Sequence, residues 1–433
     1  MAKRRPPRVT PTDPNPNRLI PQHRSQTSRH FNLQFIFYLL LSISITILSF
    51  YIYRSTLNSP TTTTTTTTSL TVYERGLVTP NIIYQQIITE NYRVSENVSR
   101  RHYTYPILAY ITPWNSRGYE MAKKFNSKFT HLSPVWYDLK SEGTQLILEG
   151  RHNADLGWMS ELRKNGHALV MPRIVLEVPP NVYLSKKKQR DKIIDLIVTE
   201  CRELGYDGII LESWSRWAAY GVLHDPDMRN KALKFIRQLG QALHSITSER
   251  NAGSQLQLVY VIGPPHSANL QEYDFGPEDL QSLGDTVDGF SLMTYDFSNP
   301  HNPGPNAPLK WIQSVMRILL ASTSSKEQSI AYKIFIGINF YGNDFLLSKG
   351  DGGGAITGRD YVSLLEKYRP VLQWDEKSEE HMFVYSDTQG IKHAVFYPSL
   401  MSISLRLEDA RAWGAGISIW EIGQGLDYFF DLL

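Results

Sequence analysis

The stretch Tyr206-Asp207-Gly208-Ile209-Ile210-Leu211-Glu212-Ser213-Trp214 decides the fold class of this chain. Three apolar residues follow its Asp-Gly pair without polar alternation, which is typical of a parallel strand that is covered on both faces. Because side chains alternate along a strand, we expect Ile210, Glu212 and Trp214 to share one face. A carboxylate and an indole at the carboxyl end of such a strand lie where α/β barrels build their sites. The alternative is that Glu212 forms a structural ion pair and Trp214 packs against the rim.

Apolar β-like runs alternate with helix-like segments from about residue 104 to the end of the chain. The expected strands cover residues 107–112, 129–136, 168–174, 208–212, 256–262, 289–295, 334–340 and 416–420. Helix-like segments include residues 185–204, 228–247, 309–322 and 405–413. Eight strand-then-helix units predict an α/β fold, a single (β/α)8 TIM barrel over residues 104–433. A doubly wound open sheet is the alternative.

Two irregularities interrupt this alternation. Ser141-Glu142-Gly143 predicts a hairpin before the third strand. Residues 381–397 read as two extra strands joined by a turn at Asp387-Thr388-Gln389-Gly390. We therefore expect a small inserted β-rich segment before the last barrel strand, where it would wall one side of a cleft.

A basic N-terminal region precedes a long apolar segment. Residues 1–30 hold seven Lys or Arg and one Asp, whereas the rest of the chain holds 38 basic and 41 acidic residues. Residues 35–53 carry no charge, and a helix of this length spans about 28 Å, close to the hydrocarbon core of a bilayer. We expect a disordered cytosolic tail at 1–34 and a transmembrane signal-anchor helix at 35–53, which makes a type II membrane protein with a lumenal or extracellular barrel. A cleaved signal is the alternative.

A threonine-rich stem and linker is expected over residues 54–103. The run Thr61 to Thr68 follows Pro60 and has no large apolar side chain to bury. Asn97-Val98-Ser99 is the one N-glycosylation sequon, so Asn97 is the expected acceptor if this region is lumenal. The single cysteine, Cys201, excludes an internal disulfide, so the core alone must stabilise the domain.

Several classes of function find no support in the sequence. The charge of the folded part is nearly balanced, which gives no case for nucleic-acid binding. No His-Glu-x-x-His, Cys-x-x-Cys or Gly-x-Ser-x-Gly motif occurs, and the 12 His residues show no metal-ligand spacing. We therefore expect no cofactor and no metal. The nine Trp and 24 Tyr are many, and such aromatic residues serve either large cores or sugar-stacking clefts.

Six segments in order resemble the strands of the family 18 glycoside hydrolases, which comprise chitinases and lectin-like relatives. They are Ala109–Trp114 (AYITPW), Thr130–Leu132 (THL), Gly208 at the start of the fourth strand, Met293–Asp296 (MTYD), Gly337–Gly342 (GINFYG) and Gly416–Trp420 (GISIW). Asn339 stands where the family usually has Pro. The resemblance covers nearly all of residues 104–433 and implies a barrel that holds oligosaccharides at the carboxyl ends of its strands.

The departures fall on the residues that carry the family's chemistry. The family's fourth strand reads Asp-Gly-x-Asp-x-Asp-x-Glu, in which the last Glu donates a proton and the preceding Asp orients the N-acetyl group. Asp207 matches the first Asp, whereas Ile210, Glu212 and Trp214 stand at the other three positions. Arg173-Ile174-Val175-Leu176 stands where the third strand has Ser-x-Gly-Gly. The catalytic acid position is therefore Trp214.

Two further runs resemble a chitinase-like subgroup more than the working chitinases of the family. They are Tyr110–Ser116 and Pro134–Trp136. This resemblance implies oligosaccharide binding without clear hydrolase activity.

Chemistry also argues against hydrolysis by the usual route. Glycoside cleavage needs a group that protonates the leaving oxygen, and an indole N–H does not act as a general acid. Losing a general acid costs about 10² to 10⁴ in rate. Glu212 lies about 6.6 Å lower along the strand, while Asp296, Glu177 and Glu421 follow other strands. No catalytic residue is expected, and Glu212 and Asp296 are the rescue candidates for a nonstandard hydrolase.

The leading interpretation is a membrane-anchored, chitinase-like protein that binds chitin-type or related oligosaccharides at the barrel mouth. The expected carbohydrate-binding residues are Tyr110, Trp114, Glu212, Trp214, Met293, Tyr295, Asp296, Tyr341 and Trp420. Trp214 and Trp420 would stack on sugar rings, and Trp136 is a weaker candidate for the same role. Two alternatives stay open: a nonstandard glycoside hydrolase, and a protein-interaction or sorting module of the secretory pathway with a vestigial sugar cleft.

Overall fold

The computed structural model describes residues 30–57 and 70–433, except residues 96, 144, 249–252, 322–327 and 348–351. The chain divides into two units, Met1–Thr68 and Ser69–Leu433. In the first unit helix α1 spans His30–Leu57, and its side chains are described from Ile36 to Ser49. None of the helices, as far as their residues are described, is long and apolar enough to cross a membrane. The expected anchor at 35–53 stays a prediction, and most of the expected tail and the Thr61–Thr68 run lie outside the described residues.

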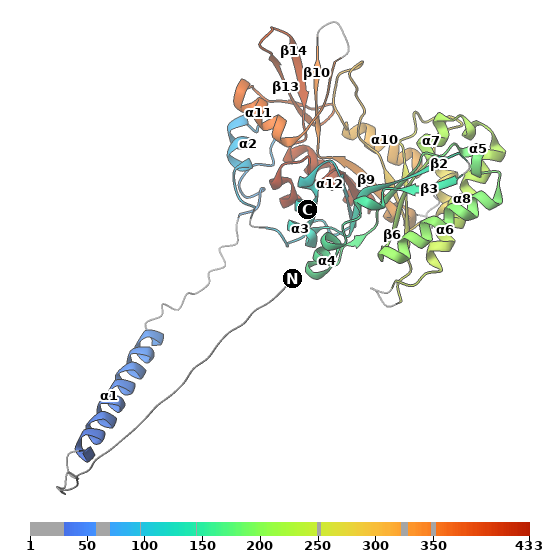
Figure 1. Cartoon of the computed structure of the whole chain (residues 1–433). Coiled ribbons are helices and arrows are strands. Elements are labelled where there is room, and N and C mark those ends of the chain that lie inside the picture. The colour runs from blue at the N-terminus through green and yellow to red at the C-terminus, as the bar shows by residue number, and fades with distance from the viewer. Residues whose placement is uncertain are drawn as a thin grey trace, which may run out of the picture. The chain divides into compact units, whose positions relative to one another are not determined.

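Eight parallel strands of the second unit close into a barrel (Figure 1). They are β1 (Ile107–Ile111), β2 (His131–Glu142), β5 (Arg173–Leu176), β6 (Gly208–Glu212), β7 (Gln257–Ile262), β8 (Gly289–Leu292), β9 (Ile334–Asn339) and β15 (Gly416–Trp420); the short β4 (Leu169–Val170) pairs with β2. Parallel pairing of β15 with β1 and of β1 with β2 closes the ring. The predicted TIM barrel is confirmed, and the open-sheet alternative is excluded by this closure.

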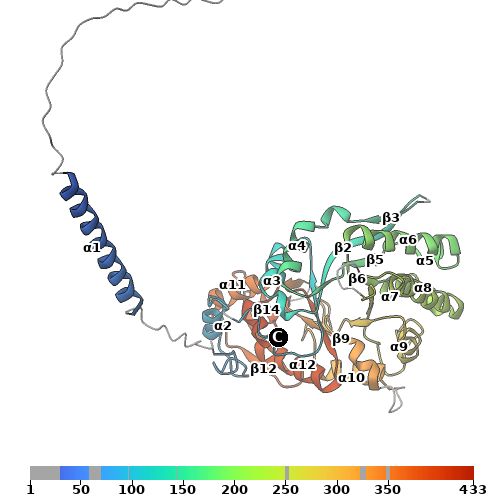
Figure 2. The same ribbon diagram turned by 90° about the horizontal axis from the view of Figure 1, so that it is seen from below.

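Helices form the layer outside the strands (Figure 2). Their bounds are α3 (Ser116–Lys124), α4 (Leu156–Asn165), α5 (Pro180–Tyr183), α6 (Lys187–Leu204), α7 (Trp214–Ala219), α8 (Pro226–His244), α9 (Pro277–Leu283), α10 (Leu309–Leu319) and α12 (Leu400–Trp413). Four of them, α6, α8, α10 and α12, lie where the sequence predicted helices. Helix α12 begins five residues earlier than expected because Ser399 caps it, accepting a hydrogen bond from the backbone N–H of Ser402.

The Asp207-Gly208 pair has a structural reason at the start of β6. Asp207 Oδ2 accepts a hydrogen bond from the backbone N–H of Val170, 2.9 Å away, which ties β6 to its neighbour. Gly208 has a φ of 147°, and a Cβ there would lie 2.1 Å from the carbonyl oxygen of Gln257. Only glycine fits this close approach of two backbones.

The barrel has an inner and an outer core. The inner core holds Leu108, Tyr110, Met171, Ile210, Val259, Val261 and Phe335. Ile209 and Leu211 belong instead to the outer core, between the strands and the helices, so the alternation predicted for β6 is confirmed up to Glu212. The strand ends there, and Trp214 begins α7. The prediction that Trp214 shares the face of Ile210 is wrong, because the chain turns at Ser213.

A five-stranded antiparallel sheet stands between β9 and α12 in the sequence. It contains β10 (Gly342–Leu346), β11 (Gly353–Ile356), β12 (Gln373–Asp375), β13 (Glu380–Ser386) and β14 (Lys392–Phe396), with helix α11 (Gly358–Tyr368) beside it (Figure 1). The two predicted strands are β13 and β14, and the other predicted hairpin is β2 with β3 (Gln145–Glu149). The sequence missed β10, which follows β9 almost at once, and β11 and β12, which are too short to show a period.

Residues 70–103, expected to belong to a linker, pack against the barrel. Four of their apolar side chains are at least 92% buried, Val72, Leu77, Ile82 and Ile87. Arg75 forms ion pairs with Glu90 (2.5 Å) and with Asp431 at the C-terminal end (3.4 Å). Helix α2 (Tyr84–Asn91) lies in this segment. The folded unit therefore begins near residue 70 and not at residue 104. The pattern gave no sign of this, because these apolar residues follow neither a helical nor a strand period.

Candidate functional site

An ion pair and two aromatic rings meet at one end of the inner core of the barrel, to which Tyr110 belongs. Arg173 on β5 donates from Nε to Glu212 Oε2 on β6 (2.7 Å) and from Nη2 to the same oxygen. The Arg173 guanidinium lies 5.4 Å from the centre of the Trp420 ring. That ring in turn lies 5.2 Å from the ring of Tyr110, whose hydroxyl donates to Ser291 Oγ on β8 (2.8 Å). These contacts join five barrel strands, β1, β5, β6, β8 and β15.

A second polar cluster follows β8 and β9. The Tyr341 hydroxyl donates to Asp296 Oδ1, and the Tyr341 ring lies 6.3 Å from that of Tyr295. Asp296 has a left-handed backbone with a φ of 59°, which is unfavourable for a residue other than glycine. Its backbone N–H donates to Oδ1 of the buried Asn306, 2.7 Å away, which holds it in this conformation. Burial and the Asp296 carboxylate raise the pKa of Tyr341, whereas Asn306 opposes this shift.

Tyr295 links the two clusters. Burial raises its pKa well above the usual value, the neighbouring Tyr110 and Glu212 groups raise it further, and Arg173 opposes them. Its ring lies against the backbone of β9, since a Cβ on Gly337 would lie 2.9 Å from Tyr295 Cε1. We name the two clusters together the mouth cluster. It contains Tyr110, Arg173, Glu212, Tyr295, Asp296, Tyr341 and Trp420, with Met293 packed on the inner core beneath it.

Seven of the nine expected carbohydrate-binding residues thus converge, and their role in binding stays a prediction. Trp214 does not join them. It is 4% exposed in the outer core, and its Nε1–H donates to the carbonyl oxygen of Tyr273 (2.9 Å). The centre of its ring lies 5.0 Å from the centre of the Phe275 ring. Trp214 is therefore not available to stack on a ligand. The weaker candidate Trp136 is also buried, and its Nε1–H donates to Tyr119 Oη (2.7 Å).

The two remaining site predictions fall outside the mouth cluster. Trp114, three residues beyond β1, is 72% exposed and lines a separate groove. Asn97 is half-buried, and its Oδ1 accepts a hydrogen bond from the backbone N–H of Arg100 (3.0 Å). Whether Asn97 carries a glycan stays a prediction.

The carboxylates that might replace the missing acid lie in different surroundings. Glu212 forms an ion pair with Arg173, and Glu177 forms one with Arg216 (2.6 Å). Glu421 is fully buried, so a ligand has no access to it. Asp296 alone of the four is exposed at the mouth.

Glu421 should make the stability of the barrel depend on pH. Burial raises its pKa to about 7 despite hydrogen bonds from Asn115 and Gly423. An acid with a raised pKa binds a proton more tightly when folded, so stability should fall as the pH rises from about 4.5 to about 7 and then level off. For a shift of this size the loss is at most roughly 3 kcal/mol.

Denaturant unfolding of the wild type and of Glu421→Gln at pH 5, 6, 7 and 8 measures this dependence. We expect the free energy of unfolding of the variant to fall less steeply with pH between pH 5 and 7 than that of the wild type. Equal slopes for the two proteins would assign the pH dependence to other groups.

Two residues of the site were missed by sequence reasoning. Arg173 was noted only as a departure from a motif, although a lone cation at the start of an apolar strand run was a usable signal. Asn306 lies in the Gly- and Pro-rich stretch between β8 and α10, where no pattern distinguishes it from other loop residues.

Comparison with known proteins shows the family to which the barrel belongs. The profile of the family described as Glycosyl hydrolases family 18 matches residues 107–425. A cortical fragment-lytic enzyme of Bacillus anthracis is 29% identical over 182 residues, which cover 40% of this chain and 41% of that protein. The chain thus spans half or less of the length of the first curated relatives it matches.

Solved structures show the same fold at low identity. A chitinase from Chromobacterium violaceum has a TM-score of 0.60 at 20% identity, covering 76% of this chain and 98% of that one. A class V chitinase from tobacco, solved in complex with NAG4, has a TM-score of 0.58 at 16% identity, covering 76% and 97%. The family match extends over most of the barrel unit, and the chain therefore belongs to glycosyl hydrolase family 18.

Proposed function

We propose that this protein binds oligosaccharides of the chitin type at the mouth cluster and does not hydrolyse them. The observation that carries the proposal is the end of β6. Glu212 is held by Arg173, Ser213 is fully buried with its hydroxyl 2.9 Å from Tyr260 Oη, and Trp214 belongs to the outer core. This strand therefore presents no carboxyl group that is free to protonate a glycosidic oxygen.

The rest of the mouth suits a sugar ligand. Trp420 is only partly buried and offers ring surface at the carboxyl end of β15. Asp296 and Tyr341 supply an exposed acceptor and a hydroxyl beside it, and the Arg173–Glu212 pair supplies further donors and acceptors. An apolar ring surrounded by a few directed polar groups is the usual composition of a small-molecule site. The tobacco relative was solved with a bound NAG4, which supports ligands of this class.

Replacing Trp420 with alanine should weaken glycan binding by tenfold or more, because a desolvated aromatic contact is removed from the centre of the site. Isothermal titration with chitooligosaccharides measures the change, and a glycan array tests related sugars. Tyr332→Ala, which removes a 56% exposed ring outside the mouth cluster, is the matched control and should change nothing. Absence of binding to every glycan by well-folded wild type would refute the proposal.

Asp296 favours a second candidate, a nonstandard hydrolase. It is the exposed carboxylate of the mouth, and the hydroxyl of Tyr341 donates to it. Turnover of a chromogenic chitooligosaccharide that disappears in Asp296→Asn would favour this candidate over the lectin. We expect no turnover by either protein.

We further propose that the chain belongs to the subgroup that the sequence resembles, the chitinase-domain-containing or stabilin-interacting chitinase-like proteins, and that residues 35–53 anchor it in a membrane. The motifs quoted above and the uncharged run within α1 support this. Carbonate extraction of membranes should leave the full chain in the pellet and release a chain that lacks residues 1–57. Release of both would contradict the anchor.

A further inference from the structure

A groove of about 730 Å³ lies at the amino ends of the barrel strands. His131, Leu169 and Gln257 line it, and these are the first residues of β2, β4 and β7. The mouth cluster contains Glu212 and Trp420, the last residues of β6 and β15. Because the two ends of parallel barrel strands lie on opposite faces of the barrel, this groove is separate from the proposed sugar site.

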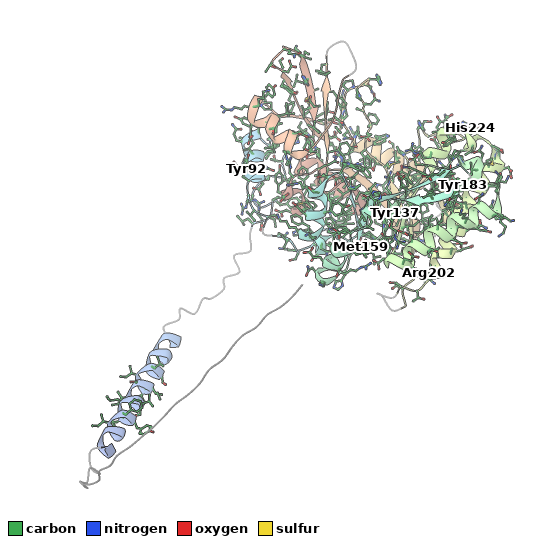
Figure 3. All side chains as sticks on the ribbon, viewed as in Figure 1. Tyr92, Tyr137, Met159, Tyr183, Arg202 and His224 are labelled. Carbon is green, nitrogen blue, oxygen red and sulfur yellow. The ribbon has the colours of Figure 1, made fainter. Side chains whose placement is uncertain are left out.

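The groove is lined by three cations. Arg101 comes from the segment that precedes β1. Arg163 and Lys164 come from the last turn of α4, the helix on which Figure 3 labels Met159. None of the described residues that line the groove is an Asp or a Glu. We name Arg101, Arg163 and Lys164 the basic cluster. Like charges around one hollow make its potential positive, because the low-dielectric walls focus their field.

Arg101 is half-buried and forms no ion pair with the residues that the structure describes. Its Nη2 donates to the carbonyl oxygen of Tyr105, which orients the guanidinium without neutralising its charge. Burial lowers the pKa of Arg101 and also that of Arg406, but Arg406 has the carboxylate of Glu380 at 3.1 Å. A cation that is withdrawn from water without a counter-charge costs free energy. An anionic ligand would supply the charge that Arg101 lacks.

Arg163 and Lys164 add positive charge to the same groove. Arg163 Nη2 donates to the carbonyl oxygen of Gly205, and the carboxylate of Asp207 lies 3.9 Å from the same nitrogen. Because Asp207 Oδ2 also accepts a hydrogen bond from the N–H of Val170, it offsets only part of the charge. Lys164 is exposed, and within the described part of the chain its side chain forms no ion pair. The basic cluster therefore keeps an excess of positive charge.

We propose that the basic cluster binds a compact oxyanion, the phosphate or sulfate group of a ligand, at the amino end of the barrel. The planar guanidinium of Arg101 suits such a group, because its parallel N–H donors match two oxygens of a tetrahedral anion. Ser127 and Asn165, both exposed in the groove, offer further hydrogen bonds. The site is independent of the proposed function. Arg101 also precedes the family match, which begins at residue 107, so the matched barrel does not supply this cation.

Isothermal titration of the full chain with inorganic phosphate, inorganic sulfate and glucose 6-phosphate, at constant ionic strength, tests the proposal. Arg101→Met should weaken binding of these anions by roughly tenfold or more, because a charge-assisted hydrogen bond is lost. Arg101→Lys keeps the charge without the planar fork and should lose less. Lys164→Met should weaken binding by roughly threefold, because its ammonium group is exposed. Lys310→Met removes an exposed lysine on α10 and is the matched control, which should change nothing.

The source of the anion follows from the same titrations. Tighter binding of glucose 6-phosphate than of inorganic phosphate would assign the site to a phosphorylated ligand, and equal binding would assign it to the free ion. Either result supports the proposal. Affinity for chitooligosaccharides should be the same in the wild type and in all the variants, because the mouth cluster lies at the other end of the barrel.

The proposal is overturned if the wild type binds none of the three anions. It is also overturned if Arg101→Met and Lys164→Met bind phosphate as tightly as the wild type does. Thermal unfolding shows whether each variant is folded. If Arg101→Met does not fold, the exposed Lys164 still decides the matter, since its replacement leaves the core untouched.

Discussion

Replacing Trp214 with alanine is expected to lower the free energy of unfolding by about 3–5 kcal/mol, the cost of deleting a large buried aromatic side chain. The ring packs against Phe275 and Trp217, with centre distances of 5.0 and 6.1 Å, and the Arg229 guanidinium lies 5.0 Å above it. The change would also leave the carbonyl oxygen of Tyr273 without its donor. Denaturant unfolding followed by fluorescence measures the loss.

Trp114→Ala is the matched control, because it removes the same side chain from an exposed position. Its effect on stability should stay within about 0.5 kcal/mol. The sugar affinity of Trp214→Ala, measured under conditions in which this variant is still folded, should be close to that of the wild type. A Trp214→Ala protein that unfolds like the wild type but loses sugar binding would instead place this indole in the site.

Trp214 is also the residue at which the strand pattern of the sequence no longer predicts the structure. Alternation predicted the faces of Ile210 and Glu212 correctly, because period two holds as long as the strand continues. The prediction for Trp214 failed because it assumed that the strand extends as far as the family's motif. The turn at Ser213 transfers Trp214 and Trp217 to one face of α7, three residues apart, and both pack into the outer core.

Other parts of the site depended on contacts that no local pattern encodes. The barrel strands were predictable since each is a continuous apolar run between helices. Glu212 was recognised as a group at the end of a strand, yet its partner Arg173 lies 39 residues earlier. The position of Asp296 depends on Asn306, and the position of Asn306 depends on the inserted sheet. Only the three-dimensional structure brings these residues together.

Arg406 is one of the residues that join the inserted sheet to the barrel. It is 3% exposed on α12, and its Nη2 lies 3.1 Å from Glu380 Oε1 on β13. The same guanidinium donates to the carbonyl oxygens of Ala307, Ser378, Glu379 and Ser402. Glu380 in turn accepts hydrogen bonds from the backbone N–H groups of Asn306 (2.8 Å) and Ala307 (2.7 Å). The network therefore reaches Asn306, which holds Asp296 at the mouth.

Arg406→Met should destabilise the protein by about 3–5 kcal/mol, because methionine keeps much of the volume but leaves the buried Glu380 carboxylate without its cation. Arg216→Met is the control: it breaks the more exposed pair with Glu177 and should cost no more than about 1 kcal/mol. Adding Glu380→Gln to Arg406→Met should recover part of the loss, since no uncompensated charge then remains. Equal costs for Arg406→Met and Arg216→Met would contradict this role.

Arg406→Met should also bind sugar more weakly than Arg216→Met does, because Asn306 lies on the same network. Titration of both variants with sugar, below their unfolding transitions, measures this coupling between the inserted sheet and the mouth cluster.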